Sequence, residues 1–116
     1  VPLARNNLAM ILFRRGENLS QAREHARRAV EIQPDSAQFL DTLAVIESAL
    51  GKPDQAVQRI RRAVELAPDN LEIRVNLAYV LTRADRMEEA TQLDQLPDAV
   101  KARLEKVRKQ LQVAGA

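Results

Sequence analysis

The sequence predicts an all-α protein, an α-solenoid of antiparallel helix pairs with about three repeats and a C-terminal capping helix. An internal repeat is the main basis for this prediction. Residues 22–35 return as residues 56–69, with eight of fourteen positions identical at an offset of 34 residues, where about one identity is expected by chance. Gly and Pro fall between the apolar stretches, as turn residues do. A fixed period of this length is typical of stacked helical hairpins.

The composition indicates one small domain with an aliphatic core. The chain has 116 residues, and aromatic residues make up only 3% of them. Leu, Val, Ile and Ala must therefore fill the core, and an Ala-rich core favours helices packed closely on helices. The absence of cysteine excludes a disulfide framework, a thiolate zinc site and a cysteine nucleophile.

The charge balance does not favour a nucleic-acid ligand, because 18 basic and 16 acidic residues leave a net charge of only +2. No apolar run approaches the ~20 residues that span a bilayer. The chain begins at Val1 instead of Met, so we expect a piece of a longer protein. Its compartment, cytoplasm or periplasm, is left open.

Two helices are predicted before Pro34. The first, Pro2–Arg15, has apolar residues at three- and four-residue spacing: Leu3, Leu8, Ile11 and Leu12. Gly16 ends it at the position where positive φ is needed. Asn18 caps the second helix, with Gln21 as its capping-box partner. That helix runs to about residue 32 and buries Ala22, Ala26, Ala29 and Val30.

The second repeat has the same plan. Asp35 and Gln38 signal the start of a helix over about residues 36–50, which buries Leu40, Leu43, Ala44, Ile46 and Leu50. Gly51 closes this helix, and Pro53 opens the next one at its first turn, where the missing N–H costs nothing. The buried residues of that helix are Ala56, Val57, Ile60, Ala63 and Val64.

The third repeat is less regular. Pro68 stops the preceding helix, and Asp69 with Glu72 caps a helix that buries Ile73, Leu77, Ala78 and Leu81. We expect a short helix over about residues 87–96 and, beginning at Pro97, a capping helix to about residue 112. The repeats then cover about residues 2–35, 36–69 and 70–96, the last with a degenerate second helix.

These residues resemble the tetratricopeptide repeat (TPR) family, whose pattern includes W-x2-L-G-x2-Y, A-x3-F and a final Pro. The middle repeat matches from the Trp position onward at Leu40, Leu43, Ala44, Ala56, Ile60, Ala63 and Pro68. The third repeat matches at Leu77, Ala78, Leu81 and Ala90, and then departs at Asp94 and Pro97. The chain has no Trp, and two Trp positions hold Arg5 and Arg74.

The resemblance implies a protein–protein interaction scaffold without enzymatic activity or cofactor. In this family the concave groove, formed by the first helix of each pair, takes a partner peptide or helix. The matching groove positions here are Asn6, Met10, Phe13, Asp41, Val45, Ser48, Glu72, Val75, Tyr79 and Thr82. Asn6 and Met10 stand where chaperone-binding members have a Lys and an Asn that clamp a carboxylate, so a C-terminal carboxylate is not the predicted ligand.

The resemblance also indicates a setting and an alternative. Arg- and Ala-rich arrays of this kind occur in bacterial secretion and exopolysaccharide export assemblies. A helical-repeat RNA-binding module is the alternative, because such modules have a similar period. The recurring pairs Arg27-Arg28 and Arg61-Arg62 would supply a basic ridge, although Glu31 and Glu65 are placed to neutralise it within each helix.

No residue pattern points to catalysis or to a metal site. His25 is the only histidine, and it aligns with Arg59 on what we expect to be an outward-facing side. No partner base can be named for Ser20, Ser36 or Ser48. Glu88, Glu89 and Asp94 fit a solvated helix face better than a metal site.

The first helix has more apolar surface than one neighbour can cover. Residues 10–13, Met-Ile-Leu-Phe, spread over most of the helix circumference at ~100° per residue. We expect Met10 and Phe13 to face the groove and Leu3 to point to where a preceding repeat would lie. The prediction is either self-association through this helix, as a two-fold homodimer, or a preceding repeat in the parent protein.

Overall fold

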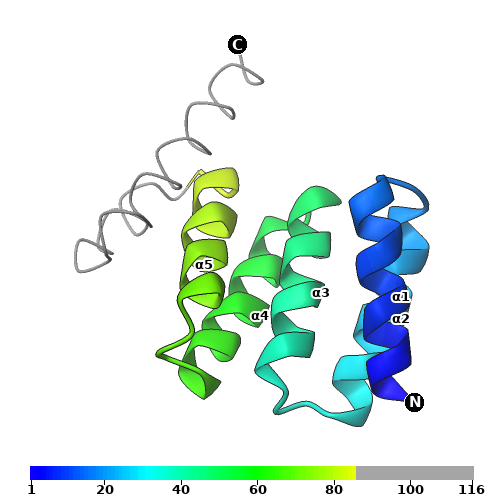
Figure 1. Ribbon diagram of the computed structural model, residues 1–116. Helices are drawn as coiled ribbons and strands as arrows, with labels where there is room; N and C mark the ends of the chain where they lie inside the picture. Colours follow the sequence, from blue (N-terminus) through cyan, green and yellow to red (C-terminus); the bar gives the residue numbers. More distant parts are fainter. Residues whose placement is uncertain (86–116) are drawn as a thin grey trace.

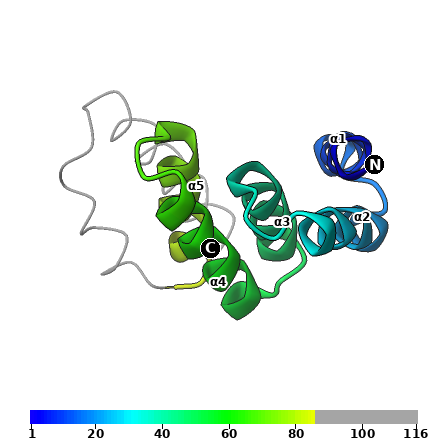
Figure 2. The ribbon, with the colours of Figure 1, turned by 90° about the horizontal axis from the view of Figure 1, so that it is seen from below.

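The computed structural model describes residues 1–85, which form a stack of antiparallel α-helices (Figure 1). Within this range, the helices are α1 (Pro2–Arg15), α2 (Leu19–Ile32), α3 (Ala37–Ala49), α4 (Pro53–Leu66) and α5 (Leu71–Arg83). Seen from below, α1, α3 and α5 form one layer, and α2 and α4 form the other (Figure 2). The predicted all-α stack of helix pairs is therefore confirmed. The helices predicted over residues 87–112 lie outside the described residues.

Glycines end the first helix of each complete pair, as predicted. Gly16 has φ 65°, and its N–H donates to the carbonyls of Leu12 and Phe13. Gly51 has φ 74° and donates to the carbonyl of Ser48. A side chain with a Cβ is strained in this left-handed conformation, which explains why glycine ends both helices.

The predicted caps of α3 and α5 are wrong by one residue. Ser36, not Asp35, accepts the hydrogen bond from the Phe39 N–H at 3.2 Å. Asn70, not Asp69, accepts from the Ile73 N–H at 3.1 Å. The turns that follow Pro34 and Pro68 include both aspartates. Ser36 and Asn70 are the first residues after these turns with the extended backbone that a side-chain cap requires.

The predicted capping box of α2 is also wrong. Asn18 does precede the helix, but its side chain makes no capping hydrogen bond. Its backbone is left-handed, with φ 50°, whereas a capping side chain is carried on extended backbone. Asn18 therefore serves the turn, since Asn tolerates this conformation better than most residues.

Alanines make up much of the buried core between the helices. Eight alanines are at most 2% exposed: Ala9, Ala22, Ala26, Ala29, Ala44, Ala56, Ala63 and Ala78. The larger buried side chains that fill the space between them include Leu43, Ile46, Ile60 and Leu81. Because α3 packs against each of the other four described helices, the core is continuous through this helix.

The predicted buried residues are largely confirmed, with two kinds of correction. Four expected core residues are only half-buried: Val30, Leu50, Val64 and Leu77. Four buried apolar residues were not predicted: Ala9, Phe39, Val75 and Val80. Neighbouring helices contact α3 and α5 from more than one side, so a single apolar stripe underestimates what these helices bury.

The inward face of α1 differs from its apolar pattern. Leu3, Leu8 and Ile11, which indicated the helix, are all exposed. The buried positions are Asn6 and Ala9, and Leu12 and Phe13 pack against the nearby core. The expectation that α1 has apolar surface left over is consistent with these exposures.

A buried ion cluster joins the two complete helix pairs. Glu47 on α3 is fully buried. Its carboxylate accepts from Nε and Nη2 of Arg23 on α2, both at 3.1 Å, and from Nε of Arg59 on α4 at 3.2 Å. A buried carboxylate is tolerated only when its charge is paired and its oxygens are hydrogen-bonded. Glu47 thus links α3 to α2 and α4, the two helices of the other layer.

The Leu43→Ala substitution should lower the free energy of unfolding by ~2–5 kcal/mol, because it leaves a cavity beside the core alanines. The Ala63→Leu substitution should cost ~1–3 kcal/mol by overpacking a helix crossing. Urea unfolding followed by circular dichroism measures both. Leu71→Ala is the control, because Leu71 is 44% exposed. Equal unfolding midpoints for all three variants would show that the assigned core is wrong.

The Glu47→Gln substitution should destabilise the fold by about 1–3 kcal/mol. Loss of one partner from a buried ion pair is costly, but the two arginines are partly solvated, which reduces the effect. Thermal unfolding at low and high salt measures it. Glu65→Gln, in the exposed pair with Arg62, should leave the melting curve nearly unchanged, and a comparable loss in both variants would contradict a special role for Glu47.

Candidate functional site

A groove of about 720 Å³ lies along the layer formed by α1, α3 and α5. Side chains from α1 and α3, together with the N-terminal end of α5, line it, and most of them are polar or charged. The lining residues are Asn6, Asn7, Met10, Ile11, Arg14, Ala37, Gln38, Asp41, Thr42, Asn70, Glu72 and Ile73. The groove is therefore a hydrogen-bonding surface with a few apolar contacts.

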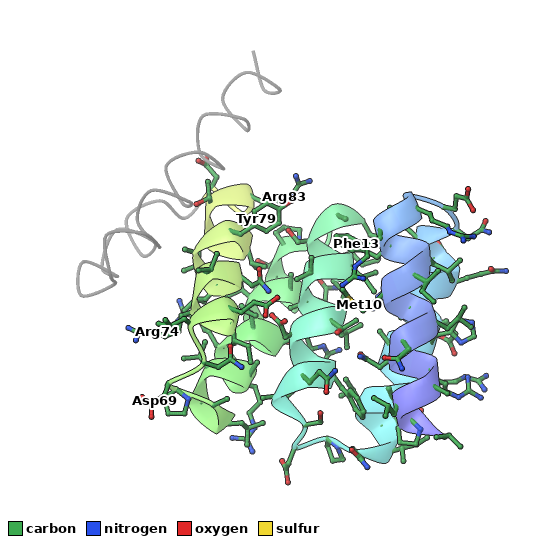
Figure 3. The ribbon with its side chains drawn as sticks, viewed as in Figure 1. Met10, Phe13, Asp69, Arg74, Tyr79 and Arg83 are labelled. Carbon is green, nitrogen blue, oxygen red and sulfur yellow. The ribbon has the colours of Figure 1, made fainter. Side chains whose placement is uncertain are left out.

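The structure brings together four of the ten groove residues inferred from the sequence: Asn6, Met10, Asp41 and Glu72. The other six lie outside this cavity. Ser48 and Val75 are buried, whereas Val45, Tyr79 and Thr82 are half-buried. Phe13 packs against the core that contains Leu43 and Ile46. Figure 3 shows Met10 and Phe13 on the side of α1 that faces α3.

Sequence reasoning missed eight of the residues that line the groove: Asn7, Ile11, Arg14, Ala37, Gln38, Thr42, Asn70 and Ile73. Ala37 and Gln38 belong to the first turn of α3, and Asn70 is the N-cap of α5. Ala37 and Gln38 lie about one helical turn before the predicted Asp41, and Asn70 lies two residues before the predicted Glu72. Counting back one turn from Asp41 would have found Gln38, since residues three apart share a helix face.

Asp41 is the most perturbed titratable group of the groove. Its two carboxylate oxygens accept hydrogen bonds from Nδ2 of Asn76 on α5, at 2.9 and 3.2 Å. The pKa of Asp41 is raised to about 6, chiefly by burial. The hydrogen bond from Asn76 opposes this rise, and the negative charge of Glu72 adds to it. Asp41 therefore changes charge near neutral pH.

Asn6 is an unsatisfied polar group that lines the same groove as Asp41. Its side chain is 2% exposed, and its Oδ1 accepts no hydrogen bond from any described residue. Thr42, by contrast, is satisfied locally, since its hydroxyl donates to the carbonyl of Gln38 at 3.1 Å. A buried amide oxygen without a donor costs about 1–3 kcal/mol, so Asn6 favours a ligand that brings an N–H group.

The other end of the α5 face has aromatic and cationic character. The Arg83 guanidinium lies over the Tyr79 ring, 5.7 Å from its centroid, and its Nη1 approaches the Tyr79 hydroxyl oxygen at 3.5 Å. Both residues lie at the upper end of α5 (Figure 3). This pair extends the possible contact surface beyond the groove itself.

In the part of the chain that the structure describes, we find no group of side chains arranged for catalysis or for metal binding. His25 is half-buried, and its Nδ1 has no partner among residues 1–85. Its counterpart Arg59 on α4 donates to the Glu47 carboxylate of α3, so this position of α4 does not face outward as expected. Within the same range, no three His, Cys, Asp or Glu side chains are grouped to hold a metal.

A stack of helical hairpins with a groove along its first helices is the architecture of a helical-repeat binding module. Two family models described as tetratricopeptide repeat match the chain, over residues 1–69 and residues 47–111. The chain belongs to the tetratricopeptide repeat family, whose members are generally protein-interaction scaffolds. A comparison with curated proteins found no match. Among the described helices, none has the length and apolar character needed to cross a membrane.

The Asp41→Asn substitution should stabilise the fold at pH 7.5 but have little effect below pH 4. The folded-state pKa is about 6 and the ordinary value is 3.8, so ionisation favours the unfolded chain as pH rises through this interval. Removing the charge should recover about 1–3 kcal/mol above pH 6. Urea unfolding between pH 4 and 7.5 measures this, with Asp69→Asn in the exposed turn as the control. A destabilised Asp41→Asn variant at pH 7.5 would contradict it.

Proposed function

We propose that this chain is a scaffold module whose groove between α1, α3 and α5 binds an extended segment of a partner protein. The observation that supports this most directly is the lining of the groove. Asn7, Gln38 and Asn70 carry side-chain amides, which offer both donors and acceptors. An extended peptide has main-chain N–H and C=O groups that need such partners, whereas a helix satisfies its own.

The apolar contribution comes from side chains along the same layer. Met10, Ile11 and Ile73 line the groove. Val45 on α3 and Tyr79 towards the other end of α5 are half-buried and extend this apolar surface. An apolar anchor residue of the peptide would supply most of the binding energy, while the amides fix its direction and register. Adaptable Met10 suits such an anchor.

RNA binding is less well supported, because acidic residues already pair with the arginines that would contact phosphates. Arg27 pairs with both Glu24 and Glu31, and Arg28 pairs with Glu24. These two arginines hold the pKa of Glu24 down at about 2. Arg62 bridges Asp35 and Glu65. The basic ridge is therefore largely neutralised within the protein.

Two finer expectations from the sequence stay predictions. One is the setting in a bacterial secretion or exopolysaccharide export assembly. The other is a homodimer through α1, or coverage of α1 by a preceding repeat. The exposed side chains of Leu3, Leu8 and Ile11 are compatible with either form of coverage.

Peptides selected from a random phage-displayed library against the whole chain test the proposed function. Val45→Glu and Tyr79→Ala, which change half-buried apolar positions flanking the groove on the same layer, should each weaken the binding of the selected synthetic peptides about tenfold or more, because apolar and aromatic contacts carry most of the affinity of such interfaces. Both variants should stay within about 1 kcal/mol of the original stability, since these positions are half-buried. Fluorescence anisotropy measures the affinities.

Gln58→Ala serves as the matched control, because Gln58 is exposed on α4 in the other layer. It should bind the selected peptides as the unmodified chain does. Peptides that bind Val45→Glu and Tyr79→Ala at full affinity, but lose affinity to a variant on the α2 and α4 layer, would move the site away from the groove.

A further inference from the structure

The charges that line the groove are unevenly placed. Asp41 and Glu72 come from neighbouring helices of the same layer, and Arg14 is the cation that lines the same cavity. Asn6 and Asp41 lie at the same level of α1 and α3, because equivalent positions of these helices are 35 residues apart. Arg14 is eight residues beyond Asn6, about 12 Å along the helix axis. The lower half of the groove, which Asn6, Asp41 and Glu72 line, is therefore acidic.

Asp41 differs from the other acids that contact neighbouring helices. Glu47 and Asp35 each accept from an arginine of another helix. Asp41 instead accepts from the neutral amide of Asn76, and the charge that acts on it, Glu72, has its own sign. Holding this anion half-buried lowers folding stability above pH 6. A ligand cation would remove that cost.

Asn6 provides a second, independent indication of a ligand. Its side chain is almost fully buried, lines the groove and has an Oδ1 that accepts no hydrogen bond from a described residue. The pairing that Asp41 lacks is a cation, and the pairing that Asn6 lacks is an N–H donor. A protonated amine or guanidinium on a peptide brings both kinds of group at once.

We propose that the lower half of the groove is a subsite for a lysine or arginine side chain of the bound peptide segment. The cationic head lies between Asp41 and Glu72, and an N–H of the peptide or of the head group donates to Asn6. This inference rests on the proposed function and specifies the chemistry of its partner. Asp41 then serves binding, although its charge weakens the free fold.

The size and character of the subsite fit a basic side chain. Ala37 and Ile73 also line this half of the groove, and such apolar surfaces cover the methylene stem of Lys or Arg while the charged head reaches a carboxylate. Half-burial of Asp41 keeps the local dielectric low, so the attraction is stronger than between fully solvated charges. A guanidinium, with five N–H donors, would satisfy Asp41, Glu72 and Asn6 together.

The test uses the peptides selected against the whole chain. Lysine or arginine should be enriched at one fixed position of the selected sequences. Replacing that arginine by citrulline, which has nearly the same shape but no charge, should weaken binding to the unmodified chain about tenfold at pH 7.5, a ratio typical of one well-formed charge pair. Asp41→Asn and Glu72→Gln should each reduce the ratio of the affinities for the arginine and citrulline peptides. Together they should bring this ratio close to one.

The pH dependence gives a second readout. Between pH 5 and 7.5 the preference for arginine over citrulline should grow, because Asp41 ionises with a pKa of about 6. Glu72 and Arg14 are the other charged groups that line the cavity. The Asp41→Asn variant should lose most of this growth. Because that variant is expected to be more stable than the unmodified chain at pH 7.5, weaker binding cannot be attributed to unfolding.

Asp69→Asn is the matched control, since Asp69 lies in an exposed turn outside the cavity. It should keep the full arginine preference. Selected peptides without a preferred basic position, or scrambled peptides that bind equally well, would overturn the basic subsite and leave the proposed function standing. A selection that yields no peptide sensitive to Val45→Glu or Tyr79→Ala would overturn the proposed function and this subsite with it.

Discussion

Close approach of helices at alanine is the constraint on which the rest of the fold depends. The eight fully buried alanines leave little side-chain volume between crossing helices, so each crossing tolerates one small residue and resists a larger one. Once these distances are set, the larger core residues on α3, α4 and α5 have defined spaces to fill. The same distances bring α1, α3 and α5 near enough to border a single groove.

Much of this fold was predictable from local patterns. Repeat period, turn glycines and apolar spacing identified the helices within one or two residues because each signal acts over a few positions. Glu47 shows the limit of such signals. It stands where the family pattern has Tyr, and it is tolerated there because Arg23 and Arg59 reach it from 24 and 12 residues away. A buried ion cluster of this kind has no local signature.

The candidate site was predictable in outline only. Family positions identified Asn6, Met10, Asp41 and Glu72 because each lies on the inner face of a first helix. They did not predict that Ser48 and Val75 are buried, since burial depends on how strongly the layer curves. Nor did they predict the raised pKa of Asp41. That depends on Asn76, which is 35 residues away, and on the combined effect of burial and Glu72.

The turn between α1 and α2 has a consequence for how such arrays vary in length during evolution. Ala22 lies six residues after Gly16, whereas Ala56 lies five residues after Gly51. The additional residue is absorbed where Asn18 adopts a left-handed backbone, at a conformational cost of about 1 kcal/mol. Both buried alanines keep their places at the helix crossings. Insertions at these turns can therefore accumulate in a lineage without disturbing the core, and they gradually obscure the period by which the repeats are recognised.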